Sequence, residues 1–331
     1  LLRDLQHLVL EHDDAVGLVE DVCQVRVRVL DRLQTVLGAT EGADVLHRTG
    51  AEVRDESGQK VQRQRHRIPT GSFMADKGNH RHFMVKEIHE QPEVVGRTLA
   101  HYVNFSAGRV QLPIDLPFDF RTLTRVSISA CGTAYLAGLI SKYWFERLAR
   151  IPVEIDVASE FRYREAPLEP GGLALFVSQS GETADTLASL RYATTERQHT
   201  LSVVNVPTST MARESAVVAP TLAGVEVGVA STKAFTCQLT VLLSLAIAAG
   251  RARGTLSTED EKELVDALIE VPGLMSEAMK REHQIEILAR ELSKAKDVLY
   301  LGRGTSYPLA LEGALKLKEI SYIHAEGYAA G

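Results

Sequence analysis

The chain has 331 residues, enough for about two domains at roughly 150 residues each. Hydrophobic residues make up 45% and charged residues 24% of it, as in ordinary globular proteins. The net charge of −6 provides no attraction to nucleic acid or to an anionic membrane, so the sequence predicts neither partner. An anionic substrate would have to be bound by local hydrogen-bond donors.

The cysteines and the apolar segments indicate a cytoplasmic protein. Cys23, Cys131 and Cys237 are far apart and form no CxxC pair, which argues against a disulfide framework or a zinc site. The uncharged run between Lys233 and Arg251 falls short of the roughly 20 apolar residues that a membrane-spanning helix needs, so we expect a buried core helix there.

The first 90 residues give a weak pattern. Residues 1–45 show no clear succession of strands and turns, and residues 46–90 are polar and basic. Five histidines in the second stretch raise the possibility of a metal site: His47, His66, His80, His82 and His89. The spacing of His80 and His82 puts no pair on one helical face, which favours a solvated linker without a metal.

From Arg125 onward, short apolar strands alternate with helices. Strands are predicted at 126–130, 173–177 and 200–204, and helices at 135–148 and from Ser231 onward. This alternation predicts an α/β fold with a parallel sheet covered by helices on both faces.

A second copy of the pattern follows a helical stretch at 256–294. The strand at 298–301 and the helix at 308–320 flank Arg303-Gly304-Thr305-Ser306-Tyr307, which echoes Cys131-Gly132-Thr133-Ala134-Tyr135. We therefore expect two similar α/β domains, the second cut off at Gly331.

The segment Ser178-Gln179-Ser180-Gly181-Glu182-Thr183 is the strongest candidate for a binding site. It follows a buried strand and precedes a helix, at the sheet edge where open α/β folds bind ligands. Three hydroxyl groups, a glycine and a helix N-terminus together suit a phosphate group. A simple helix cap is the alternative, although a cap needs only one hydroxyl.

Two further features have competing interpretations. Cys131 could be a nucleophile at a helix N-terminus, but without an identifiable histidine partner we favour a small residue lining a ligand pocket. Glu312, Lys316 and Glu319 share one helix face, either as a surface ion-pair stripe or as a general base held beside a lysine.

Four segments resemble the family of glutamine–fructose-6-phosphate aminotransferase (isomerizing). They are residues 81–92, 178–186, 228–235 and 311–326. Sugar isomerase (SIS) domains in general share the Ser/Thr-rich loop but not this whole set. The first segment is similar to that enzyme's linker between its glutaminase and isomerase domains.

The resemblance implies a substrate site for fructose 6-phosphate, with no cofactor and no metal. Glu319 would be the base that moves a proton between C1 and C2 of the sugar, with Lys316 close by. The phosphate and hydroxyl groups of the sugar would be held by Thr133, Ser178, Gln179, Ser180 and Thr183, with Gly132, Val229 and Ser231 completing the pocket.

The resemblance also implies a domain plan built on three-layer, flavodoxin-like SIS domains. We expect a glutaminase-domain remnant at 1–75, a linker at 76–95, a complete first SIS domain at 96–255, and connecting helices with the start of a truncated second SIS domain at 256–331. The implied ligands are fructose 6-phosphate and glucosamine 6-phosphate. Glutamine would enter only through the missing glutaminase domain, and the full-length protein would be a homodimer.

The chain departs from the family in ways that lower its expected activity. Residues 1–45 do not resemble a glutaminase domain, and a shifted reading frame is one hypothesis for them. Ala134 stands where the family usually has serine. The family's ring-opening histidine and imine-forming lysine are expected beyond Gly331, so we expect weak sugar-phosphate binding and no synthesis from this chain alone.

Two rival functions remain. A non-catalytic SIS module that senses a phosphosugar is one, and Glu319 argues against it because a sensor needs no proton-transfer base. An isomerase or deglycase built from SIS domains alone is the other, and the linker-like segment at 81–92 disfavours it.

Overall fold

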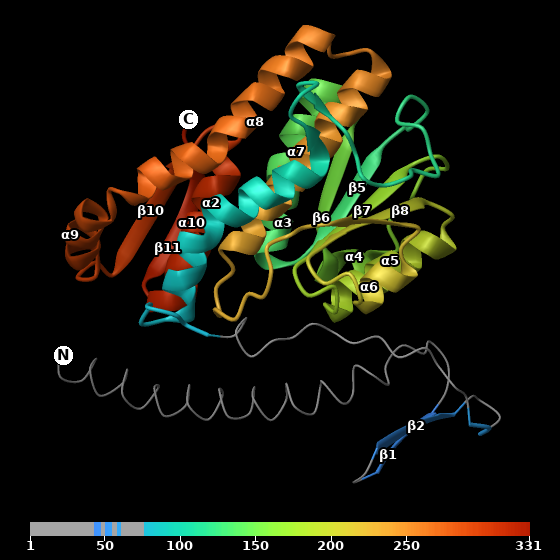
Figure 1. Ribbon diagram of the computed structural model, residues 1–331, viewed down its shortest axis with the longest axis horizontal. Coiled ribbons are helices and arrows are strands. Elements are labelled where there is room, and N and C mark those ends of the chain that lie inside the picture. Colours follow the sequence, from blue (N-terminus) through green and yellow to red (C-terminus); the bar gives the residue numbers. More distant parts are fainter. Residues whose placement is uncertain (1–42, 48–49, 55–57, 61–75) are drawn as a thin grey trace. The chain divides into compact units, whose positions relative to one another are not determined.

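The computed structural model describes residues 43–47, 50–54, 58–60 and 76–331 (Figure 1). The chain divides into two units, one before and one after the boundary between Met74 and Ala75. In the first unit, β1 (Ala43–His47) pairs antiparallel with β2 (Gly50–Arg54). Most of the predicted glutaminase remnant, with Cys23 and His66, lies outside the described residues.

The second unit is built around a parallel sheet. In the described part of the chain it has five strands in the order β6-β5-β7-β8-β9, and every neighbouring pair is parallel. This is the order of flavodoxin-like doubly wound sheets, so the predicted fold class is confirmed. The strands in chain order are β5 (Val126–Ala130), β6 (Val153–Val157), β7 (Leu173–Ser178), β8 (His199–Val204) and β9 (Val217–Pro220).

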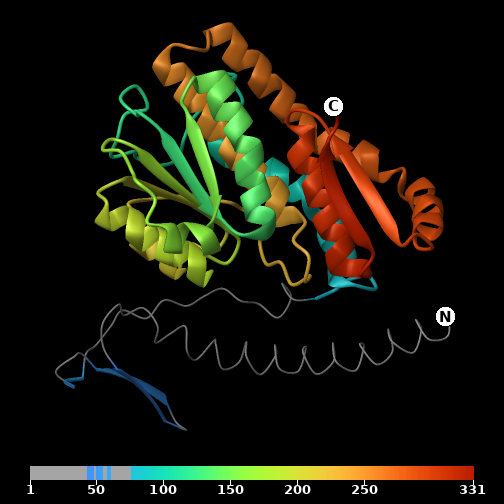
Figure 2. The same ribbon diagram turned by 180° about the vertical axis from the view of Figure 1, so that it is seen from behind.

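Helices cover both faces of this sheet, as the two opposite views show (Figures 1 and 2). On one face lie α3 (Gly132–Trp144), its π-helical extension η2 (Phe145–Ala149) and α7 (Lys233–Arg253). On the other lie α4 (Ala158–Arg164), α5 (Ala184–Thr195) and α6 (Thr210–Glu214).

Strand β7 shows how the sequence produces this three-layer packing. Leu173, Leu175 and Val177 belong to the core beneath α3 and α7, whereas Ala174 and Phe176 belong to the core beneath α5 and α6. Side chains alternate between the two faces of a strand, and both faces are covered here. A continuous apolar run is therefore required, which is the pattern that predicted the strand.

A second helical layer packs on the outer side of α7. It consists of α2 (Phe83–Tyr102) and α8 (Thr258–Met279), which bury Val95, Leu99 and Val265 against Ile247. The short hairpin β3 (Val103–Asn104) and β4 (Arg109–Val110) follows α2.

The prediction of a solvated linker is wrong for residues 83–90. These residues form the first turns of α2, and Glu87 is 2% exposed. The apolar residues that bury this helix, including Val94, Val95 and Leu99, follow the polar stretch in sequence. The polar pattern of residues 46–90 therefore gave no indication that the first turns of α2 are packed against the rest of the unit.

Helix α7 confirms the predicted core helix. Among the described residues it is the one helix long and apolar enough to span a membrane, and 78% of its most apolar window is buried inside the unit. A core helix passes the same test of length and composition, and the burial of α7 is that of a core helix.

The C-terminal part of the second unit contains a smaller parallel sheet. After α9 (Glu282–Leu292), β10 (Asp297–Gly302) pairs parallel with β11 (His324–Ala329) through the crossover helix α10 (Ser306–Ser321). The strand and helix predicted in this region are confirmed. Helix α10 packs against α3, one of the helices that cover the five-stranded sheet (Figure 2).

Candidate functional site

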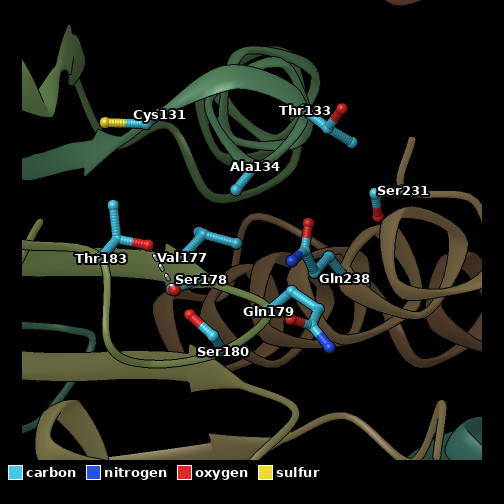
Figure 3. A pocket seen from close by; sticks show the side chains of 10 residues that line it. All are labelled: Cys131, Thr133, Ala134, Val177, Ser178, Gln179, Ser180, Thr183, Ser231 and Gln238. Atoms are coloured by element: carbon cyan, nitrogen blue, oxygen red, sulfur yellow. Dashed lines mark hydrogen bonds between the residues drawn. The ribbon is translucent and has the colours of Figure 1, made fainter. Parts of the chain in front are cut away.

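A cavity of about 240 Å³ opens at the carboxyl ends of β5 and β7. The chain leaves these neighbouring strands in opposite directions, towards β6 and towards β8, and this topological switch point is where open α/β sheets bind ligands. Figure 3 shows the side chains that surround it, which are Cys131, Thr133, Ala134, Val177, Ser178, Gln179, Ser180, Thr183, Ser231 and Gln238.

The loop after β7 presents hydroxyl groups to this cavity. Ser178 and Thr183 share a hydrogen bond between their hydroxyl oxygens at 3.1 Å (Figure 3), and Ser178 Oγ also accepts from the Gly181 amide at 3.0 Å. Thr183 is the N-cap residue of α5, yet its side chain makes no capping hydrogen bond. The simple cap interpretation is therefore not supported, and the first amide groups of α5 lack a side-chain cap.

Thr133 connects the cavity to α10. Its hydroxyl donates to Glu312 Oε1 at 3.0 Å and accepts from Lys316 Nζ at 2.9 Å. Lys316 Nζ also lies 2.6 Å from Glu319 Oε2 and 3.5 Å from Glu312 Oε1. The structure thus joins the predicted pocket residue Thr133 to the two predicted catalytic residues, although neither Lys316 nor Glu319 lines the cavity itself.

Burial distinguishes the two carboxylates beside Lys316. The Glu312 side chain is 8% exposed and that of Glu319 is 36% exposed. Burial raises the pKa of Glu312, while the Lys316 charge and the Thr133 hydrogen bond oppose that rise. A surface ion-pair stripe does not describe this cluster, because Glu312 and Lys316 are largely buried, and Glu319 is the more exposed of the two carboxylates.

The other predicted residues divide into two groups. Ser178, Gln179, Ser180, Thr183 and Ser231 line the cavity together with Thr133. Gly132 and Val229 do not line it: Gly132 begins α3, and the Val229 side chain is 99% exposed. Cys131 is a free thiol in the cavity wall, as the pocket-lining interpretation expected.

Gln238 is a cavity residue that the sequence analysis did not single out. It is 2% exposed, and its Oε1 has no hydrogen-bond partner among the described residues. A buried polar atom is normally paired, so an unpaired acceptor in a cavity wall suits a ligand donor. The available signal was a glutamine, the largest polar side chain inside the uncharged run of α7.

A metal is not indicated in the described part of the chain. No group of three or more His, Cys, Asp or Glu side chains there is placed to hold a metal ion. The rings of His80 and His89 lie 5.2 Å apart between centroids, tilted by 32°, and His89 Nε2 lies 3.3 Å from Glu282 Oε2.

Comparisons with known proteins agree with this geometry. The SIS domain model matches residues 120–248 and 291–331. The chain is 68% identical over 287 residues to glutamine–fructose-6-phosphate aminotransferase [isomerizing] from Bradyrhizobium diazoefficiens, and 67% identical over 287 residues to the Mesorhizobium japonicum protein of the same name. Each match covers 87% of this chain and 47% of the relative, so the chain spans about half the length of these relatives.

A solved structure has the same fold. It is the C-terminal domain of glucosamine-fructose-6-phosphate aminotransferase from Francisella tularensis, with 40% identity and a TM-score of 0.72. The match covers 77% of this chain and 71% of that one.

Proposed function

The chain belongs to the SIS domain family and, within it, to the glutamine–fructose-6-phosphate aminotransferases (isomerizing), and on that premise we propose that it binds fructose 6-phosphate in the cavity at Ser178–Thr183. The observation that carries the proposal is the set of hydroxyl groups and uncapped amides of α5 at the sheet's switch point. No lysine or arginine is among the described residues that line the cavity, so neutral donors would hold the phosphate.

We further propose that the parent protein converts fructose 6-phosphate and glutamine into glucosamine 6-phosphate and glutamate. Ammonia released from glutamine would condense with C2 of the open-chain sugar, with loss of water, to give an imine. In the isomerisation step, Glu319 then removes a proton from C1 of this imine and returns it to C2, and hydrolysis of the glutamine-derived acyl group gives glutamate. Lys316 lies 2.6 Å from Glu319 and links this carboxylate to the cavity through Thr133.

The partners of the parent protein are part of the same proposal. Glutamine would be handled by a separate glutaminase domain, and the full-length protein would act as a homodimer. A cytoplasmic location suits the two cysteines in the described residues, Cys131 and Cys237, which are both free thiols.

Calorimetric titration of the chain tests the binding site. Fructose 6-phosphate is expected to bind and unphosphorylated fructose is not, because the phosphate supplies most of the recognition. Ser180→Ala should weaken binding by roughly 3- to 10-fold by removing one hydroxyl donor. Ser276→Ala is the matched control, since Ser276 lies on the exposed side of α8 and bonds only to Pro272 O. Equal affinity for fructose and fructose 6-phosphate would refute the site.

Proton exchange separates an enzyme from a phosphosugar-sensing regulator. In D₂O, an isomerase base should exchange the C1 protons of the open-chain fraction of fructose 6-phosphate. Glu319→Gln should abolish this exchange and preserve binding. A regulator would bind the sugar phosphate with no exchange in either protein, as followed by proton NMR.

A further inference from the structure

The loop between β9 and α7 contributes to the cavity but has no regular secondary structure of its own. Residues 226–232 of this loop carry Ser231 into the cavity wall, and Val229 at its centre is 99% exposed. The shape of such a segment depends on where its backbone N–H groups find acceptors. In this loop those acceptors are carboxylates.

Glu87 of α2 holds the middle of the loop. Its Oε1 accepts from the Val227 amide at 2.5 Å, and its two oxygens accept from the Gly228 amide at 3.2 and 3.1 Å. The side chain is 2% exposed. A carboxylate buried to this extent is stable only when it is paired, so these charge-assisted bonds fix both partners.

The close approach of Glu87 leaves no room for a side chain at position 228. A Cβ atom at this position would lie 2.5 Å from Glu87 Oε2 and 3.4 Å from Met84 Cα. Any side chain there would therefore displace the carboxylate or move the loop away from α2.

The end of the loop is held in the same way. Lys233, 5% exposed, pairs with Glu90 of α2 at 2.6 Å. Glu226 accepts from the Thr232 amide at 2.8 Å and from the Ser231 hydroxyl at 2.9 Å. The cavity residue Ser231 is therefore bounded on both sides by segments that are fixed to α2.

We propose that Glu87 is a positioning residue for the cavity: it fixes the loop backbone at Val227 and Gly228 so that Ser231 is presented to the phosphosugar, with Glu90 holding the far end through Lys233. This inference rests on the proposed function of the cavity. It assigns α2, which resembles a linker in sequence, a role in shaping the substrate site.

The test combines binding with a direct signal from the loop. Glu87→Gln keeps the size of the side chain but turns an acceptor of two amides into a group that is partly a donor. Fructose 6-phosphate binding, measured by calorimetry, should weaken by about tenfold. The Val227 and Gly228 resonances in the ¹⁵N amide spectrum should shift or broaden.

The matched control is Glu93→Gln on the same helix. Glu93 is 74% exposed and pairs only with Arg97, so this variant should leave both the affinity and the two amide resonances unchanged. Gly228→Ala disturbs the same contact from the loop side and should reproduce the effects of Glu87→Gln. It provides the test if Glu87→Gln does not fold.

Two results would overturn the inference. The first is that Glu87→Gln binds fructose 6-phosphate with an affinity within twofold of wild type. The second is that the Val227 and Gly228 resonances of Glu87→Gln do not differ from those of wild type. If the wild-type chain does not bind fructose 6-phosphate at all, the proposed function fails. The role of Glu87 in fixing the loop is then judged on the amide resonances alone.

Discussion

The hydroxyl group of Thr133 has one proton and two charged neighbours, and their arrangement fixes the direction of its hydrogen bonds. Lys316 can only donate, so Thr133 accepts a hydrogen bond from it and donates its own hydrogen bond to Glu312. This leaves Glu312 Oε2 buried without a partner in the described part of the chain. The cluster therefore contains a carboxylate that is only partly satisfied, at the junction between α3 and α10.

Glu312 should make the stability of the protein depend on pH. Burial raises its pKa in the folded state above the ordinary value of 4.5. At pH values between 4.5 and the raised pKa of the folded state, the folded protein binds more protons than the unfolded chain. The unfolding free energy therefore falls as pH rises through this window. Glu312→Gln removes that contribution, and urea unfolding across pH 4–7 should show wild type losing stability relative to the variant.

The pH comparison has a built-in control. Burial raises the pKa of Glu87 as well, and this contribution is present in both proteins, so it cancels in the difference. A difference between wild type and Glu312→Gln that stays constant with pH would show that Glu312 does not titrate in this window.

Gln238→Leu should separate ligand binding from stability. Losing the amide should weaken fructose 6-phosphate binding by about 3- to 10-fold, because one hydrogen bond to the ligand is lost. Without ligand, removing an unpaired buried acceptor should leave the unfolding free energy unchanged or raise it by about 1 kcal/mol. Calorimetry and urea unfolding measure the two quantities.

Thr240→Val is the control for Gln238→Leu on the same helix. Thr240 is buried, bonds to Thr236 O within α7 and does not line the cavity, so this variant should bind the sugar phosphate normally. Gln238→Leu with wild-type affinity would mean that the unpaired oxygen of Gln238 does not face the ligand.

The residue pattern alone predicted the local site residues, and the family resemblance added distant ones such as Thr133 and Ser231, but neither pointed to Gln238 or Glu87. Ser178, Ser180 and Thr183 belong to one loop, so their chemistry was visible in the sequence. Glu87 reaches the amide of Val227 across 140 positions of the chain. Neither spacing nor residue type reveals such a contact, because it depends on how α2 packs on the rest of the unit.

At the scale of the elements, the sequence predicted the central strands of the sheet but not its edge strands. The central strands β5, β7 and β8 contain no Asp, Glu, Lys or Arg and were predicted within a residue or so of their ends. The edge strands β6 and β9 were not predicted. In β6, Val153, Ile155 and Val157 alternate with acidic residues, and β9 has four residues ending in Pro220. Edge strands are commonly short, charged or proline-containing, so they lack the apolar run that marks a strand.

The turn between β7 and α5 depends on Gly181. Its φ of +66° lies in the left-handed region, and a Cβ atom there would come closer than 3.0 Å to Ser209, the N-cap of α6. Gly181→Ala should therefore lower the unfolding free energy by about 2–4 kcal/mol, from backbone strain and overpacking together. Urea unfolding at constant pH measures this loss.

Gly171→Ala isolates the backbone part of that effect. Gly171 has a similar φ of +78°, but a Cβ atom added there would meet no other atom within 4 Å. Its substitution should lower the unfolding free energy by only about 1–2 kcal/mol. Equal losses in the two variants would show that the contact with Ser209 relaxes without cost.

At the scale of the whole second unit, the two parallel sheets differ in how completely they are covered. The five-stranded sheet is enclosed by helices on both faces, whereas Leu299 and Leu301 of β10 are 66% and 67% exposed. Two-stranded sheets have little stability alone. The β10–α10–β11 segment therefore depends on the packing of α10 against α3.

Hydrogen exchange should reveal this difference as two levels of protection. Amides of β10 and β11 should exchange at least about tenfold faster than those of β5 and β7, because their local opening requires less free energy. Ala314→Glu, which places a charge at a buried position of α10, should speed exchange in residues 297–329 further and leave β7 protected. Ile320→Lys, at a position 53% exposed, should change neither region. Uniform protection across both sheets, or loss of protection in β7 together with β10 in Ala314→Glu, would mean that the unit opens as a single cooperative body and that α10 is part of the main core.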